Sequence, residues 1–305
     1  MTFNASIRNL RRRYREPVFR YLFKLFFYVP RSMTYRLGNV IGWLLWLSNG
    51  TTRNVTEINL GLCLPEKDED ERQRIAKESL RNLGRAITET PFLWAASQQR
   101  ILESIVRVEG EAHIEKAMTE QRGIICLTPH LGAWEIIGLY LSIKYPMICL
   151  YSPPDMTTLE NIMLNGRTRF GLKLAATDIR GVRVLLAALK KGEILGILPD
   201  QDPGEVGGAF APLFGVQANT ITLVTRLVQK TNAAPLVCFA ERLPAGKGYV
   251  IHFQPELKQA GTESLDVSLT EINSGIASII REYPEQYQWG YKRFKTRPTG
   301  EAQVY

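Results

Sequence analysis

From residue 105 to the C-terminus, short apolar segments alternate with longer segments in which apolar residues recur every three or four positions. The short segments predict buried strands, and the longer ones predict amphipathic helices. The predicted strands are 105–108, 123–128, 147–151, 173–176, 193–198, 236–241 and 249–253. The predicted helices are 68–94, 112–120, 134–144, 157–170, 182–191, 220–231 and 269–282. This alternation predicts an α/β fold with a largely parallel sheet flanked by helices, plus one antiparallel hairpin around 244–248.

The chain before residue 54 differs from the rest in charge. It holds ten basic side chains and one acidic side chain, and this excess accounts for the net charge of +8. A basic excess confined to one end argues against a nucleic-acid-binding domain, which carries its charge on a folded face. We therefore expect no nucleic-acid partner.

The same N-terminal segment interleaves its basic residues with phenylalanine and tyrosine, and 40–47 is strongly apolar. A membrane-spanning helix needs about 20 apolar residues, and no charge-free run reaches that length. We expect residues 1–50 to form a helical anchor that lies in the membrane interface, attached to an α/β domain at 51–305. The alternative is a helical hairpin packed on its own domain.

Cysteine and histidine usage limits the chemistry. The four cysteines, Cys63, Cys126, Cys149 and Cys238, are far apart in the sequence and predict reduced thiols. The last three lie in apolar strand-like runs, which predicts that they are buried. No cofactor-binding loop and no zinc-type spacing of cysteine and histidine is present, so we expect no cofactor and no metal site.

The segment CLTPHLGAWE at 126–135 joins the predicted strand 123–128 to the predicted helix 134–144. α/β proteins place functional side chains at strand ends, and His130 is one of three histidines in the chain. If His130 lies in the turn, Glu135 can accept a hydrogen bond from one ring nitrogen and leave the other as a general base. By spacing alone, a structural His–Glu pair is an equally good interpretation.

A second candidate site follows the predicted strand 193–198. Asp200, Gln201 and Asp202 open a loop rich in glycine and proline, in the sequence LPDQDPG. Polar residues at this position fit a site at the carboxyl edge of the sheet. The alternative is a solvated loop held by side-chain-to-backbone hydrogen bonds.

Arginines next to aromatic residues are the third candidate. Arg167 and Arg169 lie in the sequence NGRTRF, and Arg293 lies in WGYKRFKTRP. Guanidinium groups beside aromatic rings suit recognition of phosphate or of phosphorylated sugars. A plain solvated charged face is the alternative.

The order of these motifs resembles the lipid A biosynthesis lauroyl/myristoyl (late) acyltransferase family of Gram-negative bacteria. The matching elements are TPHLGAWE, the arginine cluster, LPDQDPG, GAFAPLFG, PEQYQW and KRFKTRP. The resemblance extends from about residue 10 to about residue 300.

This resemblance implies transfer of a fatty acyl group from acyl carrier protein to a hydroxyl of a 3-hydroxyacyl chain on a (Kdo-)lipid A precursor. It places the reaction at the cytoplasmic face of the inner membrane. His130 and Glu135 correspond to the catalytic positions, with Arg167 or Arg169 and Asp200 in support. The partners implied are acyl carrier protein, the lipid A precursor and the membrane surface.

Three alternatives remain at this level. An acyltransferase acting on a glycerophospholipid is the nearest, and a catalytically inert lipid-binding protein is another. Cys126 could also carry the acyl group covalently, although its place in an apolar strand favours inert packing and direct transfer.

Overall fold

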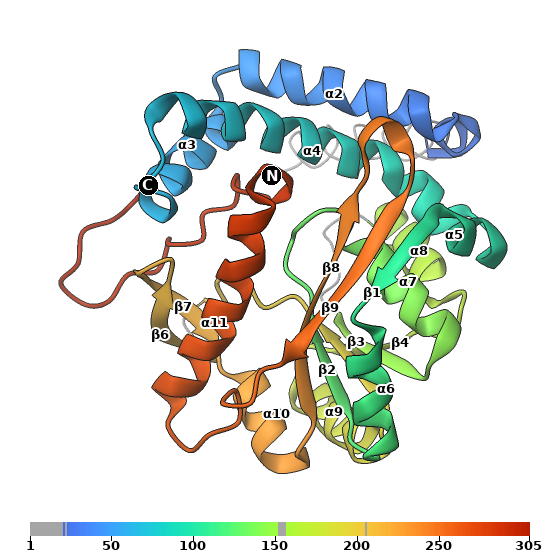
Figure 1. Ribbon diagram of the computed structural model, residues 1–305, viewed down its shortest axis with the longest axis vertical. Helices are drawn as coiled ribbons and strands as arrows, with labels where there is room; N and C mark the ends of the chain where they lie inside the picture. Colours follow the sequence, from blue (N-terminus) through green and yellow to red (C-terminus); the bar gives the residue numbers. More distant parts are fainter. Residues whose placement is uncertain (1–20, 22, 152–156, 205) are drawn as a thin grey trace, which may run out of the picture.

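The computed structural model describes residues 21, 23–151, 157–204 and 206–305. Within these residues, seven strands form one sheet in the order β1-β9-β8-β2-β5-β3-β4 (Figure 1). Their bounds are β1 (Ile105–Glu109), β2 (Ile124–Leu127), β3 (Met147–Tyr151), β4 (Lys173–Ala176), β5 (Ile194–Ile197), β8 (Ala234–Arg242) and β9 (Tyr249–Glu256). β8 and β9 pair antiparallel, and the other neighbouring strands pair parallel.

Helices cover both faces of this sheet. α6 (Glu111–Thr119) and α7 (Glu135–Lys144) bury their apolar residues against one face. α9 (Ile179–Lys190), α10 (Leu223–Thr231) and α11 (Leu265–Glu282) pack on the other. The α/β prediction is confirmed, because strands buried on both sides need helical cover on both.

One segment departs from the prediction. A β-hairpin of β6 (Gly208–Leu213) and β7 (Val216–Ile221) forms in the segment that the sequence predicts to be a loop. It also includes the first two residues of the helix predicted at 220–231. Its two-residue turn has positive φ at both Phe214 (53°) and Gly215 (81°), as a type I′ turn requires. Only the second of these residues is glycine, so the sequence signal for a tight turn is weak.

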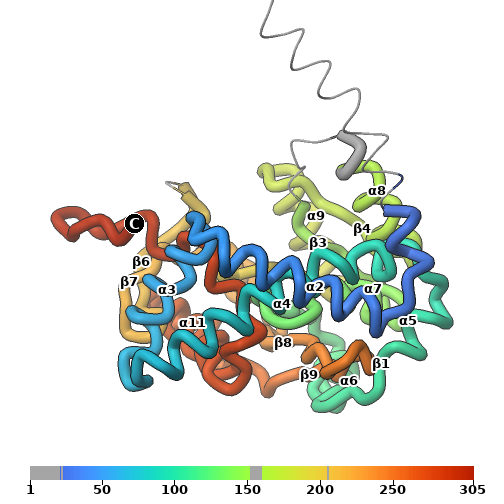
Figure 2. Tube along the Cα trace, turned by 90° about the horizontal axis from the view of Figure 1, so that it is seen from above, coloured from blue at the N-terminus to red at the C-terminus, as the bar shows by residue number. Residues whose placement is uncertain are grey.

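The N-terminal part contributes α2 (Arg31–Leu47), α3 (Thr51–Cys63) and α4 (Glu69–Ala95). α2 and α4 lie side by side across the end of the sheet at which β8 ends (Figures 1 and 2). Glycines allow this close approach: a Cβ at Gly84 would lie 2.1 Å from the Gly38 carbonyl oxygen.

The expected anchor is therefore partly a helix packed on its own domain. None of the helices in the described ranges is long and apolar enough to cross a membrane. The part of the anchor prediction that concerns residues 1–20 lies outside the described residues.

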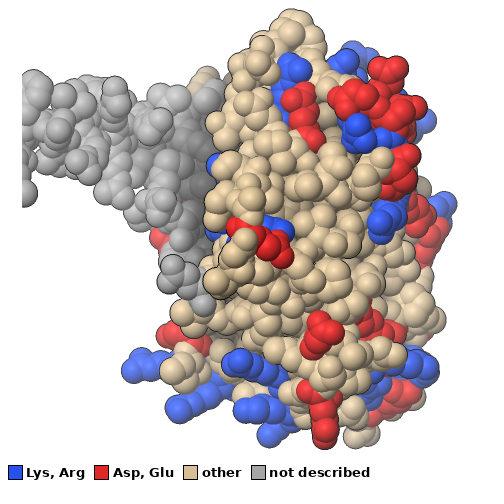
Figure 3. All heavy atoms as spheres, turned by 90° about the vertical axis from the view of Figure 1, so that its left-hand side faces the viewer, with Lys and Arg blue, Asp and Glu red and all other residues tan. Residues whose placement is uncertain are grey.

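The side of the molecule that carries the β6–β7 hairpin and the C-terminal segment bears charges of both signs (Figure 3). Basic side chains gather at the lower end of this view with acidic ones among them, and a wide stretch in the middle carries few charges.

Candidate active site

Two strand ends bring His130 and Asp200 together. β2 and β5 are parallel neighbours, and Leu127 of β2 is in register with Ile197 of β5. Each strand is followed by one residue and a proline, so that His130 and Asp200 stand at the same offset from this register pair. Side chains at equal offsets from adjacent parallel strands meet at the carboxyl edge of the sheet.

Asp200 holds His130 at two points. Its Oδ2 accepts the backbone N–H of His130 at 2.8 Å, and its Oδ1 lies 2.9 Å from the ring Nδ1. An ionised carboxylate only accepts hydrogen bonds, so Nδ1 carries the proton and Nε2 carries the lone pair. The side chain of Asp200 is 2% exposed and that of His130 is 17% exposed, so the ring edge reaches the surface while its partner is buried.

The electrostatics of the pair favour the charged imidazole. Burial alone would lower the pKa of His130, but the Asp200 carboxylate outweighs it and raises the pKa above its ordinary value. Burial pushes the pKa of Asp200 upward, and the hydrogen bonds from His130 bring it below its ordinary value. A base whose protonated form is stabilised in this way gains proton affinity.

Two side chains lie beside the imidazole ring. The Gln201 amide nitrogen lies 3.3 Å from Nε2 of His130, where its N–H donates to the lone pair, and the Trp134 ring lies 5.3 Å from the imidazole ring between centroids. The predicted residues His130, Asp200 and Gln201 thus form one cluster.

Glu135 does not make the hydrogen bond to His130 that the sequence predicts; Asp200 takes that place. As the first residue of α7, Glu135 pairs through both carboxylate oxygens with Arg167 of α8 (Thr157–Thr168) and accepts the indole N–H of Trp94 at 2.9 Å. A bidentate guanidinium holds a carboxylate more firmly than a single imidazole N–H does, which explains the different partner. Glu135 still acts on His130 through its charge, which raises the pKa of the imidazole.

The structure separates the two candidate arginines. Arg167 pairs with Glu135, whereas Arg169 donates to the backbone carbonyls of Leu93, Ala96 and Gly166. All three guanidinium nitrogens of Arg169 donate to these carbonyl oxygens, so Arg169 buttresses the end of α4 rather than pairing with Glu135.

Arg293 and Asp202 both have structural roles at the β7 strand. Arg293 is 3% exposed and donates to the Asn219 carbonyl oxygen at 2.7 Å. Asp202 accepts from the Asn219 amide at 2.9 Å and from the backbone N–H groups of Gly204 and Thr296. Asp202 fastens the loop that follows β5 to β7 and to the C-terminal segment, and Arg293 fastens the C-terminal segment to β7. Arg293 is therefore buried away from the substrate-facing side that the sequence suggests for it.

An apolar cavity of about 70 Å³ adjoins the Glu135–Arg167 pair. It lies on the α7 side of the sheet, and its apolar walls include Ile137, Leu139, Met147, Leu150, Leu172 and Leu174. Cys149 and Gly196, which are register partners in β3 and β5, form part of its floor. The site therefore combines a histidine held in one tautomer, a buried ion pair and an adjoining apolar cavity.

A family model described as bacterial lipid A biosynthesis acyltransferase matches residues 6–296. The chain belongs to this lipid A acyltransferase family. The lipid A biosynthesis palmitoleoyltransferase of Escherichia coli (strain K12) is 30% identical over 279 residues, covering 91% of this chain and 90% of that protein. The lauroyltransferase of the same strain is 30% identical over 273 residues, covering 89% and 88%. The myristoyltransferase of that strain is 26% identical, covering 88% and 82%.

Membership makes this chain a lipid A acyltransferase of lipopolysaccharide biosynthesis and confirms the resemblance seen in the sequence. Within the family fold, sequence reasoning missed the partnership of Asp200 with His130 and that of Trp94 with Glu135. The first had a usable signal, because His130 and Asp200 follow their strands at equal offsets. The second had none, because Trp94 lies on a distant helix.

Proposed function

We propose that this acyltransferase moves a fatty acyl group from acyl carrier protein to a hydroxyl of a 3-hydroxyacyl chain on a lipid A precursor, with His130 as the general base. The observation that carries the proposal is the His130–Asp200 contact, which fixes the ring so that Nε2 faces the accessible side. Asp200 is the orienting carboxylate, and Glu135 with Arg167 forms the charged pair beside it.

The transfer needs no covalent enzyme intermediate. Nε2 of His130 takes the proton from the acceptor hydroxyl, whose oxygen attacks the thioester carbonyl carbon. The tetrahedral intermediate then breaks its C–S bond, and the departing thiolate recovers the proton from the imidazolium. The negative charges of Asp200 and Glu135 both raise the pKa of His130, so they favour the imidazolium that forms in the first step.

Cys126 does not suit the role of acyl carrier. It is 0% exposed, and its interaction with Cys238 together with burial raises the pKa of its thiol well above the ordinary range. A buried, protonated thiol is a poor nucleophile. This supports direct transfer between the two substrates.

The apolar cavity supplies a place for the donor acyl chain. Its polar end carries Glu135 and Arg167, and its other walls are aliphatic. An acyl chain entering from the carboxyl edge of the sheet would bury its methylene groups there, at about 0.8 kcal/mol for each. The thioester carbonyl would then remain at the polar end, near the base.

The outer face of α2 supplies the surface for the membrane-bound acceptor. A stripe of exposed apolar residues recurs at intervals of three and four along it: Met33, Leu37, Val40, Trp43, Leu44 and Leu47. The opposite face is occupied by Thr34, Gly38 and Gly42, which pack on α4. With its inner face fixed, α2 can present its apolar stripe only outward, as an interfacial helix does. This stripe supports association with a membrane surface, and the family resemblance implies that this surface is the cytoplasmic face of the inner membrane.

One experiment tests the proposal against its nearest rivals. Purified protein receives an acyl carrier thioester with either a lipid A precursor or a lysophospholipid, and mass spectrometry identifies the product. An acylated lipid A precursor supports the proposal, and an acylated glycerophospholipid would replace it. No transfer to either acceptor, with both lipids bound, would indicate a lipid-binding protein.

A further inference from the structure

The turn that carries His130 is held from behind by a buried polar network. Gly132, two residues after His130, has φ of +60°, and a Cβ there would lie 2.0 Å from the Ala240 carbonyl oxygen. Its N–H donates to the Gln286 carbonyl oxygen at 3.0 Å, and its carbonyl oxygen accepts from Nη2 of Arg242 at 2.9 Å. Both polar backbone groups of Gly132 are therefore paired, and these hydrogen bonds hold the turn that carries His130.

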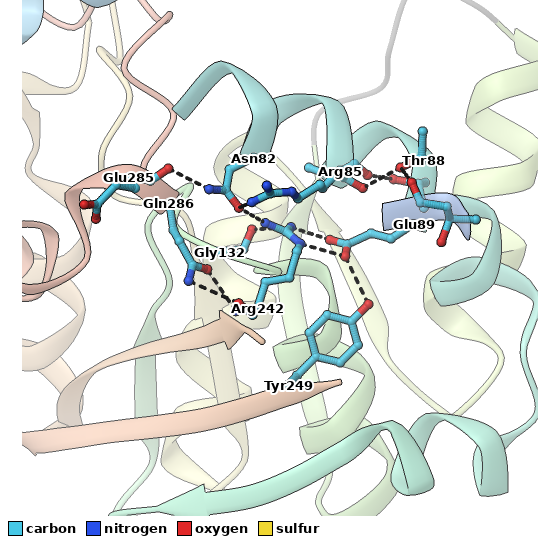
Figure 4. A network of polar contacts seen from close by, with 12 residues as sticks. Asn82, Arg85, Thr88, Glu89, Gly132, Arg242, Tyr249, Glu285 and Gln286 are labelled. Carbon is cyan, nitrogen blue, oxygen red and sulfur yellow. Dashed lines mark hydrogen bonds and ion pairs between the residues drawn. The ribbon is translucent and has the colours of Figure 1, made fainter. Parts of the chain in front are cut away.

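Arg242 connects this turn to α4. Its Nε donates to Glu89 at 2.9 Å, its Nη2 bonds the other Glu89 oxygen as well as Gly132, and its Nη1 donates to Asn82 at 3.0 Å (Figure 4). The hydroxyl of Tyr249 donates to the same Glu89 carboxylate at 3.0 Å. The Arg242 side chain is 3% exposed, so no part of this arrangement depends on the surface.

Gln286 closes the network on the other side. Its side chain accepts the backbone N–H of Arg242 at 2.9 Å and donates to the Arg242 carbonyl oxygen at 3.2 Å. Its own carbonyl oxygen receives the Gly132 N–H. Arg242 and Gln286 therefore bond the two polar backbone groups of one residue, Gly132, while they also bond each other.

We propose that Arg242 is a positioning residue for His130, which it holds in place through the carbonyl oxygen of Gly132. Like the assignment of His130 as the base, this role rests on the proposed function. A guanidinium is needed because a single group must satisfy both Glu89 oxygens, Asn82 and Gly132 at once. A lysine supplies one nitrogen on a flexible stem, so it can neutralise Glu89 without holding the turn.

The test compares Arg242→Lys with Tyr249→Phe. Lysine preserves the charge opposite Glu89 and releases the Gly132 carbonyl, whereas phenylalanine removes a hydrogen bond to Glu89 that does not contact the turn. Misplacement of a base by about 1 Å costs on the order of 100-fold in rate, so we expect kcat of Arg242→Lys to fall about that much with KM for the acyl donor unchanged. Tyr249→Phe should keep kcat within about threefold, because it removes a single hydrogen bond remote from the reacting atoms.

A second readout does not depend on turnover. With three histidines in the chain, ¹⁵N-labelled imidazole signals can be assigned by substitution, and the His130 signals should shift in Arg242→Lys but not in Tyr249→Phe. If Arg242→Lys does not fold, the pair Glu89→Gln with Arg242→Met removes both buried charges together, and we expect the same loss of kcat.

The positioning role would be overturned if Arg242→Lys and Tyr249→Phe lost activity equally and in proportion to their loss of folded protein. Wild-type kcat in the Glu89→Gln, Arg242→Met double variant would also overturn it. Absence of transfer by the wild-type protein would instead overturn the proposed function. In that case the His130 signals still decide whether Arg242 positions the ring.

Discussion

Replacing Asp200 by Asn tests the central contact of the site. The substitution keeps the size and shape of the side chain and removes one of its two acceptor oxygens. In the native protein these oxygens serve two donors, the backbone N–H and the ring Nδ1–H of His130, at 2.8 and 2.9 Å. Asparagine has one oxygen for both donors.

Which donor loses its partner depends on the orientation of the asparagine amide. If the asparagine oxygen faces the backbone N–H, the amide donates toward the ring, so Nδ1 must accept and the proton moves to Nε2. That tautomer cannot take a proton from the acceptor hydroxyl. The opposite orientation leaves a buried backbone N–H unpaired, which costs about 1–3 kcal/mol. Since loss of a general base costs about 10²- to 10⁴-fold, we expect kcat of Asp200→Asn to fall within that range.

The pH dependence gives a second, independent expectation. The proposed mechanism requires neutral His130. Because the pKa of this residue is raised above 6.5, wild-type kcat/KM should fall as pH drops below the raised value. Asp200 is the largest cause that raises this pKa, so its loss should move the acid limb to lower pH. The linkage to stability has the matching sign. The raised pKa of His130 stabilises the fold below 6.5, and this contribution is lost as pH rises through the folded-state pKa.

The assay follows acyl transfer by mass spectrometry across pH for the wild type, Asp200→Asn and Asp202→Asn. Asp202 provides a matched control, because it undergoes the same chemical change two residues away and bonds Asn219, Gly204 and Thr296 rather than His130. We expect the control to keep the wild-type pH profile. Asp200→Asn with the wild-type acid limb and kcat within about threefold of wild type would refute the assignment of Asp200 as the orienting group.

Three further variants probe other parts of the site. Arg167→Lys should reduce turnover at least tenfold because lysine cannot pair bidentately with Glu135, whereas Arg169→Lys should lower Tm with less effect on kcat. A larger loss of kcat in Arg169→Lys than in Arg167→Lys would contradict the assignment. Cys126→Ala should retain turnover within about threefold, and mass spectrometry of the wild type during reaction should find no acyl–enzyme adduct. Trp43 and Leu44 are 50% and 53% exposed, so the double variant Trp43→Glu with Leu44→Glu should sediment less with anionic vesicles and keep the wild-type Tm. Unchanged sedimentation would exclude α2 as the docking helix.

The sequence predicted the sheet because its strands are short apolar runs between amphipathic helices, a pattern that depends on local burial alone. It also located His130 and Asp200 at strand ends. It did not predict their pairing, because strand order is set by long-range packing: β5 lies next to β2 although β3 and β4 intervene in the chain. The β6–β7 hairpin was missed for a local reason, since its turn places a phenylalanine at positive φ.

Glu135 was assigned the wrong contact because spacing along the chain cannot weigh a nearby residue against a distant one. His130 is close in sequence, but Arg167 arrives from α8 and Trp94 from α4, and together they satisfy the carboxylate. A contact predicted from short spacing holds only where no stronger partner is brought in by the fold.

α4 connects the proposed membrane-facing helix α2 to the proposed general base His130. One face of this helix packs on α2 through Gly84, so the apolar stripe of α2 is held at a fixed height above it. The same helix sends Glu89 to Arg242, which holds the His130 turn, and Trp94 to Glu135. Because one helix makes all these contacts, the distance from a docked bilayer to Nε2 is set by its rigid geometry rather than by a linker. An acceptor hydroxyl that stays in the lipid layer would therefore meet the base at a constant depth, which a flexibly tethered catalytic domain could not ensure.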